Sequence, residues 1–123
     1  MQRPPEFLVL IVFAIQAHAQ ATRPQLSAQA RQFEAALRNN PNDTAARGAL
    51  LEYYFLARVD PAVAIPARRR HILWLIEHRP ADKLAGSPSA TLDAAGHPLA
   101  DPRGFKLASD AWQAQISKRD ISA

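Results

Sequence analysis

The sequence predicts an all-α protein with about four helices. Ten prolines but only four glycines occur among its 123 residues. The prolines separate segments whose apolar residues recur three or four positions apart, which is the spacing of one helix face. Apolar residues make up 48% of the chain and charged residues 21%, a composition typical of proteins that fold around a core. We therefore expect helices joined by turns, with one long loop before the last helix.

The first residues have the pattern of a secretion signal. One arginine precedes the apolar run 7–15, and small residues follow it. This run is too short to span a bilayer, which takes about 20 residues. We expect a signal peptide over residues 1–19, cleaved near Ala19 or Ala21, and a domain over 20–123 without a stable membrane anchor. The protein would then be periplasmic or secreted, and the alternative is an uncleaved amphipathic N-terminus.

Two helices are predicted in the first half of the domain. The first covers 24–39, because proline suits the first helical position. Pro41 ends it, since proline disfavours helical geometry in the residue before it. The second covers 44–58, with Asp43 or Thr44 as its cap. The apolar stripes are Leu26, Ala30, Phe33 and Leu37 on the first helix and Ala46, Leu50, Tyr54 and Ala57 on the second.

Two more helices are predicted in the second half. One covers about 63–79, with Pro66 in its first turn because a deeper proline would break the helix. Residues 80–101 hold three prolines and two glycines without sustained periodicity, so we expect a long loop there. The last helix covers about 102–118, with Asp101 as its cap. Its apolar stripe consists of Phe105, Ala108, Trp112 and Ile116.

Two segments of the chain suggest an internal repeat. Residues 30–43 align with residues 69–82, and the terminating Pro-x-Asp of both segments coincides. Few residues are identical, but the apolar positions agree. The aligned apolar pairs are Phe33 with Ile72, Ala36 with Leu75, and Leu37 with Ile76.

The segment FEAALRNNPND resembles the second helix of a tetratricopeptide repeat (TPR). Phe33, Ala36 and Pro41 stand at the spacing of that family's aromatic residue, alanine and helix-ending proline. Leu50 and Tyr54 match the leucine and tyrosine of the next repeat's first helix. The second unit is about five residues longer than the family's period. Other departures are Gln29 at a small-residue position, Arg47 at the tryptophan position and Leu51 at the glycine position.

The resemblance covers residues 24–80 and implies stacked helix pairs whose concave face binds peptides or partner helices. Together with the signal pattern, it suggests an exported protein-interaction or scaffolding module with no catalysis of its own. The partner would be a protein or peptide. The candidate partner-binding residues in this register are Arg47, Tyr53, Tyr54, Arg68, Arg69 and Arg70.

Two alternatives stay open. The run Arg68–Arg70 could bind a polyanion or an anionic cell envelope, because guanidinium groups pair with phosphates and carboxylates. If the run lies at the start of a helix, it opposes the helix dipole and needs a carboxylate partner. The second alternative is that the chain is the N-terminal helical part of a larger and possibly enzymatic protein, incomplete at its C-terminus.

Other functions are disfavoured by the segment RRRHILWLIEHRP. His71 and His78 would lie about 10 Å apart along a helix, too far to share one small metal ion. The arginines bracket an apolar centre and do not line one stripe, so we expect no nucleic-acid binding. The centre is apolar on nearly all sides, which is typical of a buried helix. Because the chain also lacks cysteine and the common catalytic and nucleotide-binding glycine motifs, we expect neither an enzyme nor a cofactor.

Overall fold

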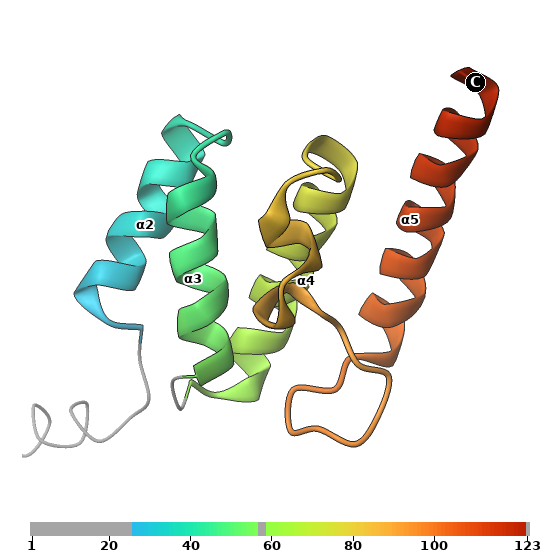
Figure 1. Cartoon of the computed structure of the whole chain (residues 1–123). Helices are drawn as coiled ribbons and strands as arrows, with labels where there is room; N and C mark the ends of the chain where they lie inside the picture. Colours follow the sequence, from blue (N-terminus) through green and yellow to red (C-terminus); the bar gives the residue numbers. More distant parts are fainter. Residues whose placement is uncertain (1–25, 57–58, 123) are drawn as a thin grey trace, which may run out of the picture.

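A computed structural model describes residues 26–56 and 59–122, which form an all-α fold (Figure 1). The predicted fold class and number of helices are therefore confirmed for the part of the chain described. The expected signal peptide and its cleavage positions lie outside it. The elements are α2 (Ala28–Asn39), α3 (Thr44–Leu56), α4 (Pro61–His78), the short 3₁₀ helices η1 (Lys83–Gly86) and η2 (Pro88–Ala90), and α5 (Pro102–Ser122).

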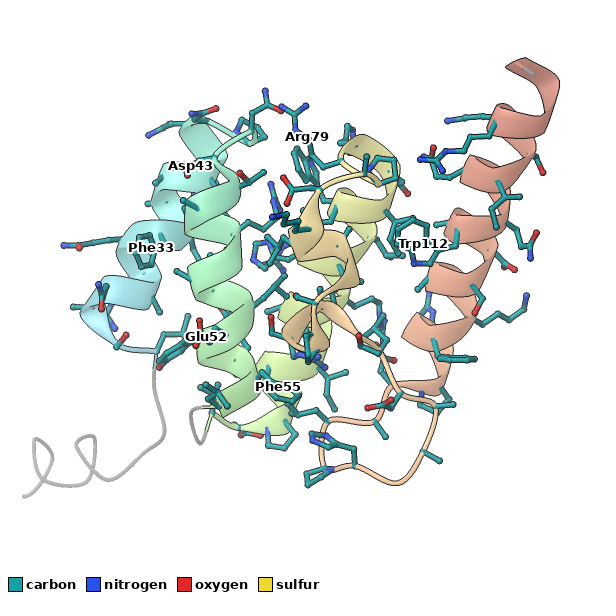
Figure 2. The ribbon with its side chains drawn as sticks, viewed as in Figure 1. Phe33, Asp43, Glu52, Phe55, Arg79 and Trp112 are labelled. Carbon is teal, nitrogen blue, oxygen red and sulfur yellow. The ribbon has the colours of Figure 1, made fainter. Side chains whose placement is uncertain are left out.

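The four α-helices follow one another in a row, with α2 at one end and α5 at the other (Figure 1). Helix α3 packs on α2 and on α4, and α5 packs on α4. The side chain of Trp112 points from α5 toward α4 (Figure 2). The segment with η1 and η2 folds back against α3 and α4, so it occupies the space between α3 and α5. Among the described elements, the outermost faces of the row therefore belong to α2 and α5.

Side-chain caps determine where the first two helices begin. The Ser27 hydroxyl accepts a hydrogen bond from the N–H of Ala30, so α2 begins four residues later than predicted. The Asp43 carboxylate accepts one from the N–H of Ala46 at 3.0 Å. Asp43, one of the two predicted caps, is therefore the cap of α3.

Helix α4 begins two residues earlier than predicted. The Asp60 carboxylate accepts a hydrogen bond from the N–H of Ala62 at 2.9 Å, and Pro61 occupies the first turn. Pro66 consequently lies inside the helix, on its exposed side, and not in the first turn. The run Arg68–Arg70 lies in the middle of α4, so the expected conflict with the helix dipole does not arise.

The predicted loop between α4 and α5 is present but contains two turns of 3₁₀ helix. Asp82 caps η1 by accepting a hydrogen bond from the N–H of Leu84 at 2.8 Å. Leu84 in turn faces Gly48 of α3, where an added Cβ atom would touch the Leu84 side chain. Ala85, Ala90, Leu92 and Leu99 of this loop are buried. The loop therefore belongs to the core.

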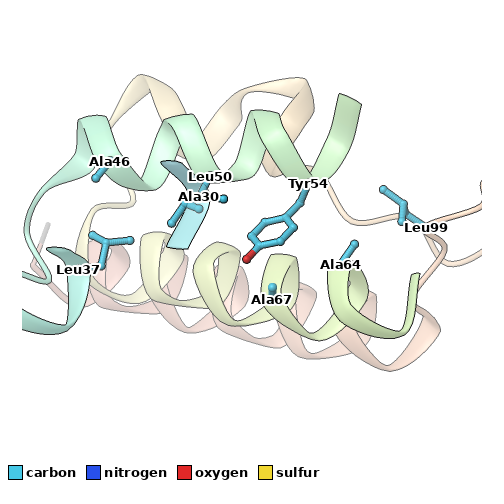
Figure 3. Packing of buried hydrophobic residues seen from close by; sticks show 8 residues of the cluster. All are labelled: Ala30, Leu37, Ala46, Leu50, Tyr54, Ala64, Ala67 and Leu99. Carbon is cyan, nitrogen blue, oxygen red and sulfur yellow. The ribbon is translucent and has the colours of Figure 1, made fainter. Parts of the chain in front are cut away.

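Two clusters of buried apolar residues hold the helices together, and α3 contributes to both. The first joins α2, α3, the first half of α4 and the end of the loop (Figure 3), and consists of Ala30, Leu37, Ala46, Leu50, Tyr54, Ala64, Ala67 and Leu99. The second joins α3, the second half of α4, the loop and α5, and consists of Leu51, Ile72, Leu75, Ile76, Ala85, Ala90, Leu92 and Ala108. The apolar centre of RRRHILWLIEHRP is therefore buried, as predicted.

The predicted stripe of α5 is only partly covered. Ala108 is buried and Trp112 is half-buried, but Phe105 and Ile116 are 46% and 50% exposed. These two side chains lie beside the face of α5 that packs against α4, and Phe105 also lines a pocket between α4, the loop and α5. Helix α5 thus presents apolar surface at the end of the row.

One ion pair fixes the start of α5 to α4. Asp101 is 3% exposed, and its carboxylate accepts hydrogen bonds from Arg69 Nε at 2.7 Å and from Arg69 Nη2 at 2.6 Å. It also accepts from the N–H of Gly104 at 2.9 Å, so it is the predicted cap of α5. The hydrogen bonds from Arg69 hold the pKa of Asp101 below its usual value, although burial acts in the opposite direction.

We predict that Gly104→Ala lowers the free energy of unfolding by about 2 kcal/mol, although alanine is usually the better helix former by about 1 kcal/mol. A Cβ atom at Gly104 would overlap the Asp101 carboxylate and approach Arg69 Nε to 3.2 Å. Gly48→Ala is the matched control, because its Cβ would meet Leu84 at an ordinary 3.4 Å. Urea unfolding followed by circular dichroism measures both. A Gly104→Ala protein as stable as the Gly48→Ala protein would contradict the prediction.

Candidate functional site

A polar network is buried where α2, α3 and α4 meet. Arg47 Nη1 lies 2.9 Å from His71 Nδ1, and His71 Nε2 lies 3.1 Å from a carboxylate oxygen of Glu34. The Tyr54 hydroxyl donates to Glu34 at 2.6 Å, and Arg70 donates to it at 3.2 Å. Arg47, Tyr54 and His71 are each at most 4% exposed. One carboxylate of α2 is therefore bound by donors from both neighbouring helices.

Arg47 determines which nitrogen of His71 carries the proton. A guanidinium group can only donate hydrogen bonds, so His71 Nδ1 accepts from Arg47. The neutral ring then carries its proton on Nε2, and this N–H donates a hydrogen bond to Glu34. Arg47 itself stacks over Trp74 at 3.8 Å and donates to the Pro41 carbonyl at 2.7 Å. Its Nε has no hydrogen-bond partner within the described residues.

The network keeps Glu34 ionised. Burial alone would raise the pKa of Glu34, but hydrogen bonds from His71 and Tyr54, with the charge of Arg70 nearby, lower it to about 2. Burial and the bond to Glu34 raise the pKa of Tyr54 well above its usual value, so its hydroxyl stays a donor. Burial also lowers the pKa of Arg47. The resulting arrangement is one anion held by fixed donors.

The three consecutive arginines of α4 bind three different neighbours. Arg68 is 2% exposed and donates to the carbonyls of Ser89 and Thr91 in the loop. Arg69 binds the cap of α5, as described above. The side chain of Arg70 is 61% exposed and binds Glu34 of α2. The run therefore does not form one surface patch, and Arg70 is its most exposed member.

The structure does not bring the six predicted partner-binding residues together. Arg47, Tyr54 and Arg68 are buried in contacts within the chain, and Arg69 is paired with Asp101. Tyr53 is half-buried, at the surface between α2 and α3. Arg70 lies on the other side of α2, in the space between α2 and α4. Each of these last two residues lines a different groove.

The first groove, which we call the α2–α3 groove, is mainly apolar and has a volume of about 490 Å³. Figure 2 shows Phe33 on α2 and Glu52 on α3, the two helices that form it. The Tyr53 hydroxyl accepts a hydrogen bond from the N–H of Ser27, which fixes this part of the wall. Leu56 at its end is 68% exposed. The lining residues are Ser27, Gln29, Ala30, Phe33, Ala49, Glu52, Tyr53 and Leu56.

The second groove, which we call the α2–α4 groove, has an apolar floor and three arginines, with a volume of about 540 Å³. Arg31 and Arg38 of α2 join Arg70 of α4 there, and Glu34 is the acidic residue among them. Sequence reasoning missed Arg31 and Arg38. Their positions seven residues apart with Glu34 between them place all three on one helix face, which the helical period alone could have indicated.

The histidines are separated from one another. His71 belongs to the network, His78 stacks on Trp74 with ring centres 4.7 Å apart, and His97 stacks on Phe55 at 5.8 Å. Within residues 26–56 and 59–122, no three histidine, aspartate or glutamate side chains are grouped in a way that could hold a metal ion. The same residues include no helix that is both long and apolar enough to cross a membrane.

No family model matches the sequence, and it matches neither a curated protein nor a solved structure. The function must therefore be inferred from the two grooves and the network between them.

We predict that acid destabilises this protein through Glu34. In the unfolded chain Glu34 takes up a proton near its ordinary pKa of 4.5, but in the folded protein only near 2. The stabilisation is therefore complete above pH 4.5 and is lost as the pH falls toward 2, by at most about 3 kcal/mol. Glu34→Gln should lower stability at pH 7 and reduce the loss of stability over this range.

Chemical unfolding at several pH values between 2 and 7 measures the effect. Glu52→Gln, which removes an exposed carboxylate of α3, is the control for the change of charge. If Glu34→Gln and the wild-type protein lose stability equally over this range, the network does not hold Glu34 as described.

Proposed function

We propose that this chain is an exported protein-interaction module of TPR-like type that binds an amphipathic helix in the α2–α3 groove. The observation that carries the proposal is the groove itself. Phe33, Tyr53 and the 68%-exposed Leu56 offer apolar surface beside one another in the groove between α2 and α3. A concave, mainly apolar surface with a few polar groups is typical of a binding site.

The groove favours a helix with an apolar stripe and a basic edge. A helix in a groove is held by apolar side chains three, four or seven residues apart. Glu52 is the charged residue of the lining, so a lysine or arginine of the partner would pair with it. The wall is rigid, because Tyr53 is bound to Ser27 and packs edge-on against Tyr54 with ring centres 5.6 Å apart. A rigid wall loses little conformational entropy on binding.

The TPR resemblance supports the same occupant. In that register α2 is the second helix of one unit and α3 is the first helix of the next. The first helix of the unit that contains α2 would pack against both α2 and α3. A helix in the α2–α3 groove would take that position. The groove is therefore suited to a helix. Export is supported by the apolar N-terminal run and the small residues after it.

A displayed library of helical peptides, selected on the full chain, tests this proposal. We predict that the selected peptides carry an apolar stripe with a basic residue beside it. Ala49→Arg, which fills the groove, should weaken their binding at least about tenfold, equivalent to about 1.4 kcal/mol. Ala94→Arg, an exposed alanine of the loop, is the matched control. Equal affinities of the two variants would contradict the proposal.

The α2–α4 groove supports a second function, the binding of an anionic polymer. Arg31, Arg38 and Arg70 line one groove, and their charge exceeds that of Glu34. This differs from the surface expected from the arginine run, because Arg68 and Arg69 are bound within the chain. Guanidinium groups along a groove suit a ligand with repeated phosphates or carboxylates. Such binding would weaken as salt screens the charges.

We predict that Arg31→Gln with Arg38→Gln lowers the salt concentration at which the protein elutes from a dextran sulfate column. Lys83→Gln with Lys118→Gln removes the same number of charges from exposed positions elsewhere and serves as the control. If the two double variants elute at the same salt concentration, net charge alone explains the retention and the groove is not the site.

A further inference from the structure

The two ends of the helix row have complementary surfaces. At one end lies the α2–α3 groove, whose lining contains one acidic residue, Glu52, and no basic residue. At the other end lies α5, which packs on α4 and on the loop and has no other described α-helix beside it. The last turns of α5 also project beyond the end of α4 (Figure 1). One end thus offers a site for a helix, and the other offers a helix.

Helix α5 has the chemistry that the groove requires. Phe105 and Ile116 lie on one face, three turns or about 16 Å apart, and are 46% and 50% exposed, and the half-buried Trp112 lies between them at spacings of seven and four residues. A third apolar residue of α5, Leu107, is 39% exposed on another side. The helix is also basic, with Arg103, Lys106, Lys118 and Arg119 against two aspartates. An exposed apolar stripe on a basic helix matches an apolar groove with an acidic rim.

We propose that this protein associates with itself head to tail, with α5 of one copy in the α2–α3 groove of the next. This inference rests on the proposed function, because it names the first partner of that groove. Each contact buries Phe105 and Ile116 of one copy against Phe33, Tyr53 and Leu56 of another, and pairs Glu52 with a basic side chain.

The contact joins two different surfaces, so every copy that binds through α5 still has an open groove. Such contacts build rings when the rotation closes and open chains when it does not. A contact between two identical surfaces would stop at a dimer. This difference separates head-to-tail association from other kinds of dimer in one experiment.

The experiment uses two variants of the full chain, each blocking one end. Leu56→Asp places a charge in the groove, and Ile116→Asp places one on the exposed stripe of α5. Both residues are at least half exposed, so the fold should be retained, and far-ultraviolet circular dichroism checks this. Sedimentation velocity at increasing concentrations then measures the mass of the wild-type protein, each variant and an equimolar mixture.

We expect the mass of the wild-type protein to rise with concentration and each variant alone to stay monomeric. In the mixture, the intact α5 of Leu56→Asp binds the intact groove of Ile116→Asp, so a dimer with twice the monomer mass forms and grows no further. A monomeric wild-type protein, or a mixture that stays monomeric, overturns the inference. Association that persists in both variants also overturns it, because residues common to all samples would then be responsible.

The selected peptides separate this inference from the proposed function. The Ile116→Asp variant keeps the groove and should bind them. Peptide binding without self-association would overturn the head-to-tail contact and leave the helix-binding function standing. Self-association as expected but without any peptide binding would restrict the groove to α5 of another copy and overturn the more general function.

Discussion

The structure depends on one half-buried carboxylate, that of Glu34. An ionised glutamate inside a protein is costly unless hydrogen-bond donors replace the water it has lost. For Glu34 of α2 these donors come from Tyr54 of α3 and from His71 and Arg70 of α4. Arg47 holds His71 in the tautomer that donates. A shift of any of the three helices along its axis would break one of these bonds, so the network selects a single arrangement among the many that apolar contacts would tolerate.

Hydrogen bonds from polar side chains of α4 also fix the positions of the loop and α5. Consecutive residues of a helix point about 100° apart, so three adjacent arginines of α4 necessarily point to three sides. Arg70 binds α2, Arg68 binds two carbonyls of the loop, and Arg69 binds the cap of α5. A run of arginine that looks like a surface patch in the sequence is therefore a connector between elements. The apolar residues between these contacts supply the stabilising burial, and the arginines determine where each neighbour lies.

The sequence was sufficient for features that depend on nearby residues. The fold class follows from helical spacing, and the caps Asp43 and Asp101 follow from side chains beside the first turn. The polar network could not be predicted in this way, because Glu34, Arg47 and His71 meet only after three helices pack. The structure of the loop between α4 and α5 could not be predicted for the same reason. The hydrogen bonds of Arg68 and the packing of Leu84 on Gly48 join residues more than twenty positions apart.

The buried network also prepares the surface on which the proposed function depends. Tyr54 is fixed by its bond to Glu34, and the neighbouring Tyr53 rests edge-on against it while facing the α2–α3 groove. Arg70 is bound to the same carboxylate from the α2–α4 groove. Tyr54 and Arg70 bind the same oxygen of Glu34, so one carboxylate connects the walls of both grooves, and a ligand in either groove meets a surface that is already ordered. This arrangement explains why polar residues occupy core positions that apolar side chains of similar size would otherwise fill: they make α2 rigid where it is exposed on two sides.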